Sequence, residues 1–475
     1  MDKKKIIIYS LLVILLTVAF MVRLWPIQIS HWWDEDVYLQ HAEIIFSGVS
    51  NYNEFNLRPP MLSLIFAAGY LIKHHVFTAS IIVSLLGTIG VLFAFLVGRE
   101  LYNEEVGFLS ALFLGLSPFM VTASHWIMTD IPSLSFITIS FYISILAVKR
   151  HNNCLFLFSG ILCGVSILTR FTSLILLFVI PLYLLVNKIS IKKLLLFGYG
   201  LGGILLPYLI WAQIRFGFFL SPFINANMAV SDTVDGAFYY LKNFLTIYPL
   251  IILLGLIVYI VYQVLLLKPS ILKKPQELLV QFHIKLTNKF SRDDLVLGLW
   301  AILFLIYISI TPHKEVRYII PIALPLYILS AKGFYALFEN KKPLIKTAVL
   351  LFIIILSISS FSGAFSRLNE PFFNTQETAP IKISNYLKSL EVKNEVIYAN
   401  HDYPVYAYYT GMNVVVLVNQ DQHFYAVFPN NMQENGYFVY YKNILKEPNY
   451  DWLESNEHFN RLKEIEDILV YEYTS

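Results

Sequence analysis

Residues 6–22 read IIIYSLLVILLTVAFMV and contain no charged side chain. As a helix, a run of this length is about enough to cross the roughly 30 Å hydrocarbon core of a membrane. Three lysines precede the run, and Arg-Leu-Trp-Pro follows it instead of the small residues of a signal-peptide cleavage site. We therefore predict a retained first transmembrane helix that enters the membrane from the cytoplasm.

The composition extends this prediction to the whole chain. Of its 475 residues, 57% are hydrophobic and 14% are charged, and the mean hydropathy is +0.61. Soluble domains carry roughly 25% charged residues, so an integral membrane protein is predicted. The net charge of +3 is too small to indicate a nucleic-acid partner. Cys154 and Cys163 fall in one apolar segment, which favours small core residues over a disulfide or a metal site.

Ten further apolar segments are long enough to cross a membrane. They lie near residues 76–98, 105–122, 132–148, 154–169, 171–187, 194–213, 244–266, 295–311, 317–332 and 345–362. With the first helix they make eleven crossings, so a mostly α-helical, polytopic membrane protein is predicted. We expect residues 1–362 to form the transmembrane module, with interfacial helices in an outer first loop at 24–75. The polar tail, 363–475, is expected to form a second domain.

The distribution of basic residues sets the expected sidedness. Residues 61–72 are apolar, but as a helix they would span only about 18 Å, which is too short for a crossing. Without them as a span, the cytoplasmic segments hold 19 of the 35 Lys and Arg residues, including the lysine-rich loop 267–293. Counting them as a span would turn that loop outward, against the positive-inside rule. We therefore expect residues 61–72 to lie along the outer membrane surface, the N-terminus to be cytoplasmic and the tail to be outside.

Under this topology the conspicuous polar side chains gather at the outer face. They are Asp34, Glu35, Arg58, Asp130, His313, Lys314, Glu315 and Arg317. A carboxylate at such a face can take the proton of an acceptor hydroxyl as a general base. Arginine and lysine can hold a phosphate and offset the charge that grows on it as it leaves. Together these groups suit sugar transfer from a polyprenyl phosphate with inversion at the anomeric carbon.

Structural alternatives stay open for most of these residues. Asp34 with Glu35, and also Asp130, could serve as helix N-terminal acids, and Arg58 could be an interfacial anchor. The cluster from His313 to Arg317 is harder to explain in this way, because charged groups near lipid are costly unless they are paired or used. Two further pairs, His74–His75 and His401–Asp402, are interpreted as surface residues and not as metal ligands.

Several of these motifs resemble the GT-C glycosyltransferases. The motifs are "DEDVY" in the first outer loop, "RPPMLSLIFA" after it, the acid Asp130 after the third span, and "HKEVRYIIPIALPL" near residue 313. They are most similar to the dolichyl-phosphate-mannose-protein mannosyltransferase type and the lipid A aminoarabinose transferase type. The pattern runs from the N-terminus to about residue 335.

The resemblance implies an inverting transferase that uses a polyprenyl-phosphate sugar, with residues 1–362 as its catalytic module. It implies that Asp34 is the base, that Glu35 or Asp130 orients the acceptor, and that Arg58 contacts the carrier phosphate. We expect His313, Lys314 and Arg317 to join Arg58 there. The sequence departs from the aminoarabinose transferases, which have lysine where Arg58 stands. It also lacks the sugar-binding-like insert of the protein mannosyltransferases, which puts a protein acceptor in doubt.

The tail has the pattern of a small α/β domain. The segments EVIYAN, NVVVLV, GYFVYYK and ILVYEY are typical of strands, and residues 380–390 and 455–464 look helical. Its segment NHDYPVYAYYTG resembles the tail of related prokaryotic transferases, where this domain would shape the acceptor site.

The partners expected are a polyprenyl-phosphate sugar donor, a glycan, lipid or protein acceptor, and the bilayer of a cell membrane. No N-glycosylation sequon occurs in the chain, which favours a prokaryotic origin. A divalent metal ion is compatible with the chemistry, but no ligand spacing indicates one. Alternative functions are a polytopic transporter, a polysaccharide polymerase or ligase that uses lipid diphosphates, and a non-catalytic scaffold. The sequence leaves the sugar and the acceptor open.

Overall fold

The computed structural model describes residues 3–25, 33–48, 55–228, 236, 238–271, 291–311, 313–339, 341–372, 377–390, 396–399, 401–417, 432–442 and 450–474. The chain divides into two compact units. We call Met1–Pro26, Asn56–Leu62 and Ser80–Phe372 the membrane unit. The tail unit is made of Ile27–Phe55, Ser63–Ala79 and Phe373–Ser475. Most of the predicted first loop therefore groups with the tail.

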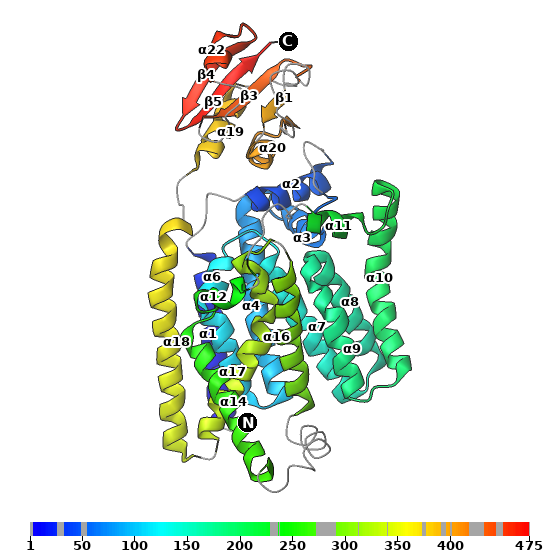
Figure 1. Ribbon diagram of the computed structural model, residues 1–475, viewed down its shortest axis with the longest axis vertical. Coiled ribbons are helices and arrows are strands. Elements are labelled where there is room, and N and C mark those ends of the chain that lie inside the picture. The colour runs from blue at the N-terminus through cyan, green and yellow to red at the C-terminus, as the bar shows by residue number, and fades with distance from the viewer. Residues whose placement is uncertain are drawn as a thin grey trace. The chain divides into compact units, whose positions relative to one another are not determined.

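All the regular elements among the described residues of the membrane unit are helices (Figure 1). Its elements are α1 (Lys3–Leu24), α4 (Val76–Leu101), α5 (Glu104–Leu116), α6 (Pro118–Ala123), α7 (Asp130–Arg150), α8 (Asn153–Thr169), η1 (Phe171–Ile175), α9 (Leu176–Val186), α10 (Ile191–Phe216), α11 (Ser221–Met228), α12 (Tyr239–Lys242), α13 (Phe244–Ile247), α14 (Leu250–Ile271), α16 (Arg292–Ile310), η3 (Val316–Ile322), α17 (Ala323–Phe338) and α18 (Pro343–Phe372).

Among the described residues, seven helices are long and apolar enough to cross a membrane. They are Lys5–Leu24, Val76–Leu101, Asp130–Arg150, Ile191–Phe216, Arg292–Ile310, Val316–Phe338 and Leu344–Ser362. Three other predicted spans coincide with shorter apolar helices, at Asn153–Thr169, Phe171–Val186 and Leu250–Val264. A polytopic, mostly α-helical membrane protein is thereby confirmed, while the number of eleven crossings stays a prediction.

The predicted span 105–122 is divided between α5 and α6. Ser117, which separates the two helices, has extended backbone with ψ 120° and is followed by Pro118. A residue before proline is driven from the helical region by the proline ring, so the helix ends there. Arg23 completes the break, because its guanidinium donates to the carbonyl oxygens of Leu114 and Gly115 at 3.0 Å. These are carbonyls that a helix end leaves without an intrahelical partner.

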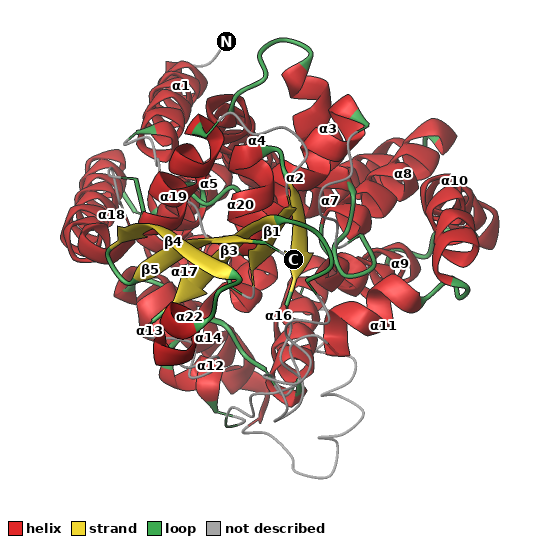
Figure 2. Cartoon of the chain, turned by 90° about the horizontal axis from the view of Figure 1, so that it is seen from above, coloured by secondary structure: helices red, strands yellow, loops and turns green. Residues whose placement is uncertain are grey.

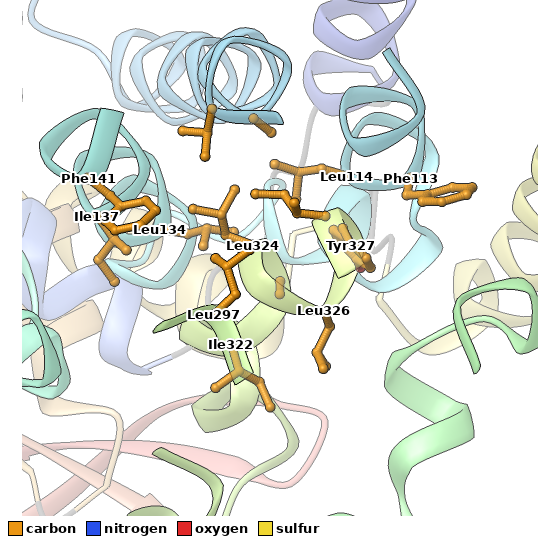
Figure 3. Packing of buried hydrophobic residues seen from close by; sticks show 14 of the residues in the cluster. Phe113, Leu114, Leu134, Ile137, Phe141, Leu297, Ile322, Leu324, Leu326 and Tyr327 are labelled. Atoms are coloured by element: carbon orange, nitrogen blue, oxygen red, sulfur yellow. The ribbon is translucent and has the colours of Figure 1, made fainter. Parts of the chain in front are cut away.

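The core of the membrane unit is built from side chains of several helices. Figure 3 shows Phe113 and Leu114 of α5, Leu134, Ile137 and Phe141 of α7, Leu297 of α16, and Leu324, Leu326 and Tyr327 of α17 in one packed layer. One hydroxyl in this layer is satisfied by a serine, because Tyr327 donates to Ser117 Oγ at 2.9 Å. Cys163 is buried in the same core, as predicted, whereas Cys154 at the start of α8 is exposed.

Helices α8 and α10 lie side by side (Figure 1) and approach through glycines. A Cβ atom on Gly200 would lie 2.0 Å from the carbonyl oxygen of Leu157, and one on Gly160 would lie 2.0 Å from that of Phe197. Both neighbours are backbone atoms, which cannot move without shifting a helix. Gly198 lies two residues earlier on α10, roughly on the opposite side of the helix, and a Cβ there would have no atom within 4 Å.

We therefore expect Gly200→Ala to separate α8 from α10 and to lower the thermal stability of the purified protein in detergent. Overpacking of a close contact typically costs about 1–3 kcal/mol. Gly198→Ala is the matched control, and it should be neutral or stabilising because alanine is the better helix former by about 1 kcal/mol. Equal melting temperatures for the two variants would contradict the close crossing.

The tail unit contains a mixed five-stranded sheet and five helices among its described residues (Figure 2). The strands are β1 (Val396–Ala399), β2 (Asn413–Val416), β3 (Gly436–Tyr441), β4 (Phe459–Ile465) and β5 (Ile468–Tyr473), in the order β2-β1-β3-β5-β4. β1 is parallel to β2 and β3, whereas β5 is antiparallel to β3 and β4. The helices are α2 (Trp33–Ser47), α3 (Met61–Tyr70), α19 (Ala379–Ser389), α20 (Tyr403–Thr410) and α22 (Tyr450–Ser455).

The sheet is covered on both faces, as an α/β domain requires. Alternate residues of β3 separate into two clusters, with Tyr437 and Val439 on one side and Phe438 and Tyr440 on the other. The first cluster includes residues of α19 and α20, and the second includes Leu453 of α22. The predicted small α/β domain is thus confirmed, including the four strand segments, whose residues 395, 400 and 418 lie outside the described ranges.

One helix prediction in the tail is wrong. Residues 455–464 were predicted as helical, but 459–464 lie in strand β4, whereas 380–389 of the predicted helix 380–390 is helical. The reason is a register shift between Arg461 and Lys463. It moves Phe459 to one core cluster and Leu462 and Ile465 to the other. The bulge thus gives a strand apolar residues at intervals of three, a spacing that imitates a helix.

Candidate active site

Helix α2 carries the three carboxylates Asp34, Glu35 and Asp36 in its first turn. Acids are favoured there because the helix N-terminus is the positive end of the helix dipole. The three differ in exposure: Glu35 and Asp36 are 0% and 1% exposed, while Asp34 keeps part of its surface. Within this turn, Asp34 is therefore the acidic residue that keeps exposed surface.

Burial changes the chemistry of Asp36. Removal from water, together with the nearby charges of Glu35 and Asp402, raises its pKa well above the ordinary value of 3.8. A carboxyl with a raised pKa holds its proton where a normal carboxyl would lose it. Asp36 therefore keeps its proton at pH values where a surface carboxyl group is ionised.

Asp36→Asn should therefore be tolerated, and its effect should depend on pH. The raised pKa means that ionisation of Asp36 opposes folding, so stability is lost as pH rises from 3.8 through the folded-state pKa. The neutral amide removes that loss. In thermal melts of the two proteins, the melting temperature of the variant should rise relative to that of the parent as the pH is raised. If the melting temperature of the variant instead rose relative to the parent as the pH fell, Asp36 would be ionised in the folded protein and its charge would stabilise the fold.

Helix α20 of the tail packs against α2. The Trp33 ring meets Tyr403 edge-on with centroids 4.1 Å apart, and His401 lies 5.9 Å from the same ring. His401 in turn pairs with Asp402, with 3.1 Å between Nδ1 and Oδ2. The hydrogen bond that His401 donates to the Asp402 carboxylate raises the pKa of His401. These contacts hold the residue that precedes Asp34, so the tail helps to orient the acidic turn.

The histidine pairs that we interpreted as surface residues have partners within the tail unit. His74 forms an ion pair with Glu43 and remains about half exposed. Asp402 accepts a hydrogen bond from Tyr441 Oη at 2.8 Å and is only 21% exposed. Among the described residues, no group of three or more His, Cys, Asp or Glu side chains could hold a metal ion.

In the membrane unit, the segment from His313 to Tyr318 forms a compact ionic cluster. Arg317 binds Glu315 through two bonds, Nε to Oε2 at 2.6 Å and Nη2 to Oε1 at 2.9 Å. His313 Nε2 and Tyr318 Oη lie 3.2 Å and 2.9 Å from the same Oε1. Burial opposes ionisation of Glu315, but the hydrogen bonds from Arg317 outweigh it and lower the pKa of the carboxyl.

Lys314 is bonded to the backbone before this pair. Its ammonium donates to the carbonyl oxygen of Thr311 at 2.6 Å, and the residue is 5% exposed. Arg58 lies in the turn before α3, partly exposed, and Pro59 behind it is buried. The roles expected of both cations stay predictions.

Asp130 is the first residue of α7, one position after the cap residue Thr129. It is 2% exposed and forms an ion pair with Arg170, whose Nη2 lies 3.1 Å from Oδ1. The Arg170 guanidinium also lies over the Tyr318 ring, 5.4 Å from its centroid. Asp130 is thus brought together with the His313–Arg317 segment through Arg170, a residue that sequence reasoning missed. The sequence feature that could have revealed Arg170 is its position as an isolated arginine between the apolar segments 154–169 and 171–187.

The comparisons with known proteins agree with this architecture. Residues 57–211 match the model of the dolichyl-phosphate-mannose-protein mannosyltransferase family. No curated protein sequence matches the chain. The fold is similar to that of ArnT from Cupriavidus metallidurans bound to undecaprenyl phosphate. The TM-score is 0.71 at 13% identity, over 98% of this chain and 97% of that one.

A second solved structure has a similar fold. It is the archaeal oligosaccharyltransferase AglB from Archaeoglobus fulgidus, in complex with an inhibitory peptide and a dolichol-phosphate. Its TM-score is 0.61 at 12% identity, over 94% of this chain and 70% of that one. The resemblance to the GT-C glycosyltransferases is thereby confirmed, and the chain has their fold.

Proposed function

We propose that this protein is an inverting glycosyltransferase that moves a sugar from a polyprenyl-phosphate donor to an acceptor hydroxyl at the outer membrane face. The observation that carries the proposal is the likeness of fold to ArnT bound to undecaprenyl phosphate, because it covers 98% of this chain, tail included. The match of residues 57–211 to the mannosyltransferase family supports a transferase. AglB, which shares the fold, also occurs with a polyprenyl phosphate, dolichol-phosphate.

The reaction needs one base and one stabilised leaving group. Asp34 accepts the proton of the acceptor hydroxyl as its oxygen attacks the anomeric carbon. The bond from that carbon to the phosphate oxygen breaks on the opposite side, and the electron pair stays on the lipid phosphate. Attack from the opposite side inverts the anomeric configuration and forms no sugar–enzyme bond. Partial exposure of Asp34, beside the buried Glu35 and Asp36, supports this choice of base.

Cations offset the charge that develops on the leaving phosphate. We assign this task to Arg58, His313, Lys314 and Arg317, with Glu315 holding the Arg317 guanidinium in a fixed orientation before substrate arrives. Arginine can offer a phosphate two parallel donors, so Arg58→Lys should not be a neutral change. Glu35 or Asp130 orients the acceptor.

The proposed setting is a cell membrane with the N-terminus in the cytoplasm and the tail outside. Reporter fusions at Ser291 and in the tail should then report opposite sides. Residues 272–290 of the lysine-rich loop and Ser475 lie outside the described ranges. Ser291 is the N-cap residue of α16, and its hydroxyl accepts a hydrogen bond from the backbone N–H of Asp294. The reporter should therefore be inserted before Ser291, so that the cap is kept.

The function is tested by mass spectrometry of cell-surface glycans and glycolipids from cells with and without the gene. We expect loss of a single sugar residue from one class of acceptor, which would name both donor and acceptor. A change in polymer length would favour a polymerase or ligase that uses lipid diphosphates. An unchanged glycan profile with altered uptake of a solute would favour a transporter.

A further inference from the structure

Arg170 is unusual in its position. It is the only Asp, Glu, Lys or Arg residue between Arg150 and Lys188, and it lies in extended backbone between α8 and η1. Its side chain is 14% exposed. A charged group inside such an apolar stretch is costly unless it is paired or used. The contacts of Arg170 indicate what it is used for.

The guanidinium joins the α8–η1 junction to two other elements of the membrane unit, α7 and η3. Nη2 pairs with Asp130 Oδ1 at the start of α7, and Nη1 donates to Thr129 Oγ1 at 3.1 Å. The guanidinium carbon of Arg170 lies over the Tyr318 ring in η3, and that of Arg317 lies 5.9 Å from the centroid of the same ring. The Tyr318 hydroxyl donates to Glu315. Two arginine–carboxylate pairs, Arg170–Asp130 and Arg317–Glu315, thus share one tyrosine.

A second contact fixes the same junction. Ser133 on α7 and Ser173 in η1 are hydrogen-bonded through their hydroxyls at 2.8 Å, one turn beyond Asp130 and three residues beyond Arg170. The backbones that carry the two charges are therefore held together independently of the ion pair. A junction fixed in this way, together with the ion pair to Arg170, restricts the Asp130 carboxylate, and such restriction favours precise positioning of a bound hydroxyl.

We propose that Arg170 is a positioning residue of the transferase, which holds the Asp130 carboxylate in place so that Asp130 orients the acceptor and does not remove its proton. This inference rests on the proposed function. A cation at ion-pair distance stabilises the charged form of a carboxylate and makes it a weaker proton acceptor. A paired carboxylate still accepts a hydrogen bond. Asp130 is therefore suited to aligning an acceptor hydroxyl by accepting its hydrogen bond.

The test is a double-mutant cycle of Arg170→Gln and Asp130→Asn, measured as kcat and as KM for donor and for acceptor. We expect each single variant to lower kcat/KM for the acceptor about 10- to 100-fold, with the donor KM unchanged. The double variant should be no worse than the poorer single variant, because both changes remove the same orientation. Arg170→Lys keeps the charge and should recover part of the activity.

The pH profile separates this role from the alternatives. With Asp34 as base, the acid limb of kcat should stay in place in Arg170→Gln. If Asp130 were the base, loss of its cation would move that limb to higher pH, and the proposal would be overturned. It would equally be overturned by a raised donor KM with additive losses, which would make Arg170 a phosphate ligand. If Arg170→Gln had the kinetic parameters of the parent but a lower melting temperature, Arg170 would have a structural role only, and the proposal would be wrong.

Two controls complete the design. Arg215→Gln removes an exposed arginine from the last turn of α10 and should leave every kinetic parameter unchanged. The parent protein must transfer sugar from a polyprenyl phosphate under the same conditions. A parent without this activity would refute the proposed function itself, whereas an active parent with an additive cycle would refute only the role of Arg170.

Discussion

Asp34→Asn is expected to lower the rate of sugar transfer by about 10²–10⁴-fold, the range that general-base catalysis contributes. The amide has nearly the same shape as the carboxylate but cannot accept the proton of the attacking hydroxyl. Binding of the lipid donor should persist, because the proposed phosphate ligands are untouched. Transfer is measured with purified protein, a polyprenyl-phosphate sugar and an acceptor extract, and donor binding is measured separately at equilibrium.

Asp36→Asn is the matched control for this experiment. It makes the same chemical change two residues away, at a carboxyl that is 1% exposed and whose pKa is raised by burial. We expect its transfer rate to stay close to that of the parent. If Asp34→Asn kept the parent rate while Asp130→Asn was inactive, the base would be Asp130, and the assignments of both Asp34 and Arg170 would be wrong.

The largest expected effect on stability is at a buried ion pair in the membrane unit. Lys332 of α17 donates to both carboxylate oxygens of Asp294 in α16, at 2.7 and 2.6 Å. Tyr102 at the end of α4 hydrogen-bonds to the same carboxylate, and Gln263 of α14 lies 3.5 Å from it. The carboxylate of Asp294 is 0% exposed, so one buried group links four helices.

Asp294→Ala should lower stability by about 3–5 kcal/mol, because it leaves the Lys332 ammonium without its counter-ion. The readout is the melting temperature in detergent. Replacing both residues together, as Asp294→Leu with Lys332→Met, should cost less than the single change, since no uncompensated charge then remains. Asp293→Ala is the control at the neighbouring position, where the residue is only partly buried. Equal effects at 293 and 294 would contradict this account of the pair.

The features that the sequence predicted best depend on local pattern. Apolar runs such as 6–22 and 132–148 could be predicted as helices, because length and apolar composition alone show whether a segment is suited to cross a bilayer. The strands of the tail were recognisable because β-branched and aromatic residues cluster in them. Likewise, the carboxylates of "DEDVY" lie in the first turn of α2, where acids are favoured.

The features that the sequence did not reveal depend on contacts between distant segments. Arg170 and Asp130 are forty residues apart, and neither spacing nor composition pairs them. The packing of Trp33 on Tyr403 joins the first loop to the tail, which residue patterns treat as separate parts. Strand β4 was mistaken for a helix because a bulge altered its alternation, and a bulge is fixed by the partner strand.

Asp36 shows a further limit. In the sequence it is one of three adjacent acids, and a solvated carboxylate is the ordinary expectation for it. Its burial and the proximity of Asp402 become evident only once the tail has folded beside α2. The resemblance alone selected Asp34 as the base, and the structure adds that Asp34 is the member of the turn with exposed surface.

The most direct test of the central claim is the anomeric configuration of the product. Purified protein is incubated with a polyprenyl-phosphate sugar of defined configuration and an acceptor, and the new glycosidic bond is examined by NMR spectroscopy. A single displacement with Asp34 as base predicts the inverted configuration and release of the lipid monophosphate, with neither formed by Asp34→Asn. Retention of configuration, or transfer from a lipid diphosphate but not from the monophosphate, would contradict the proposed function.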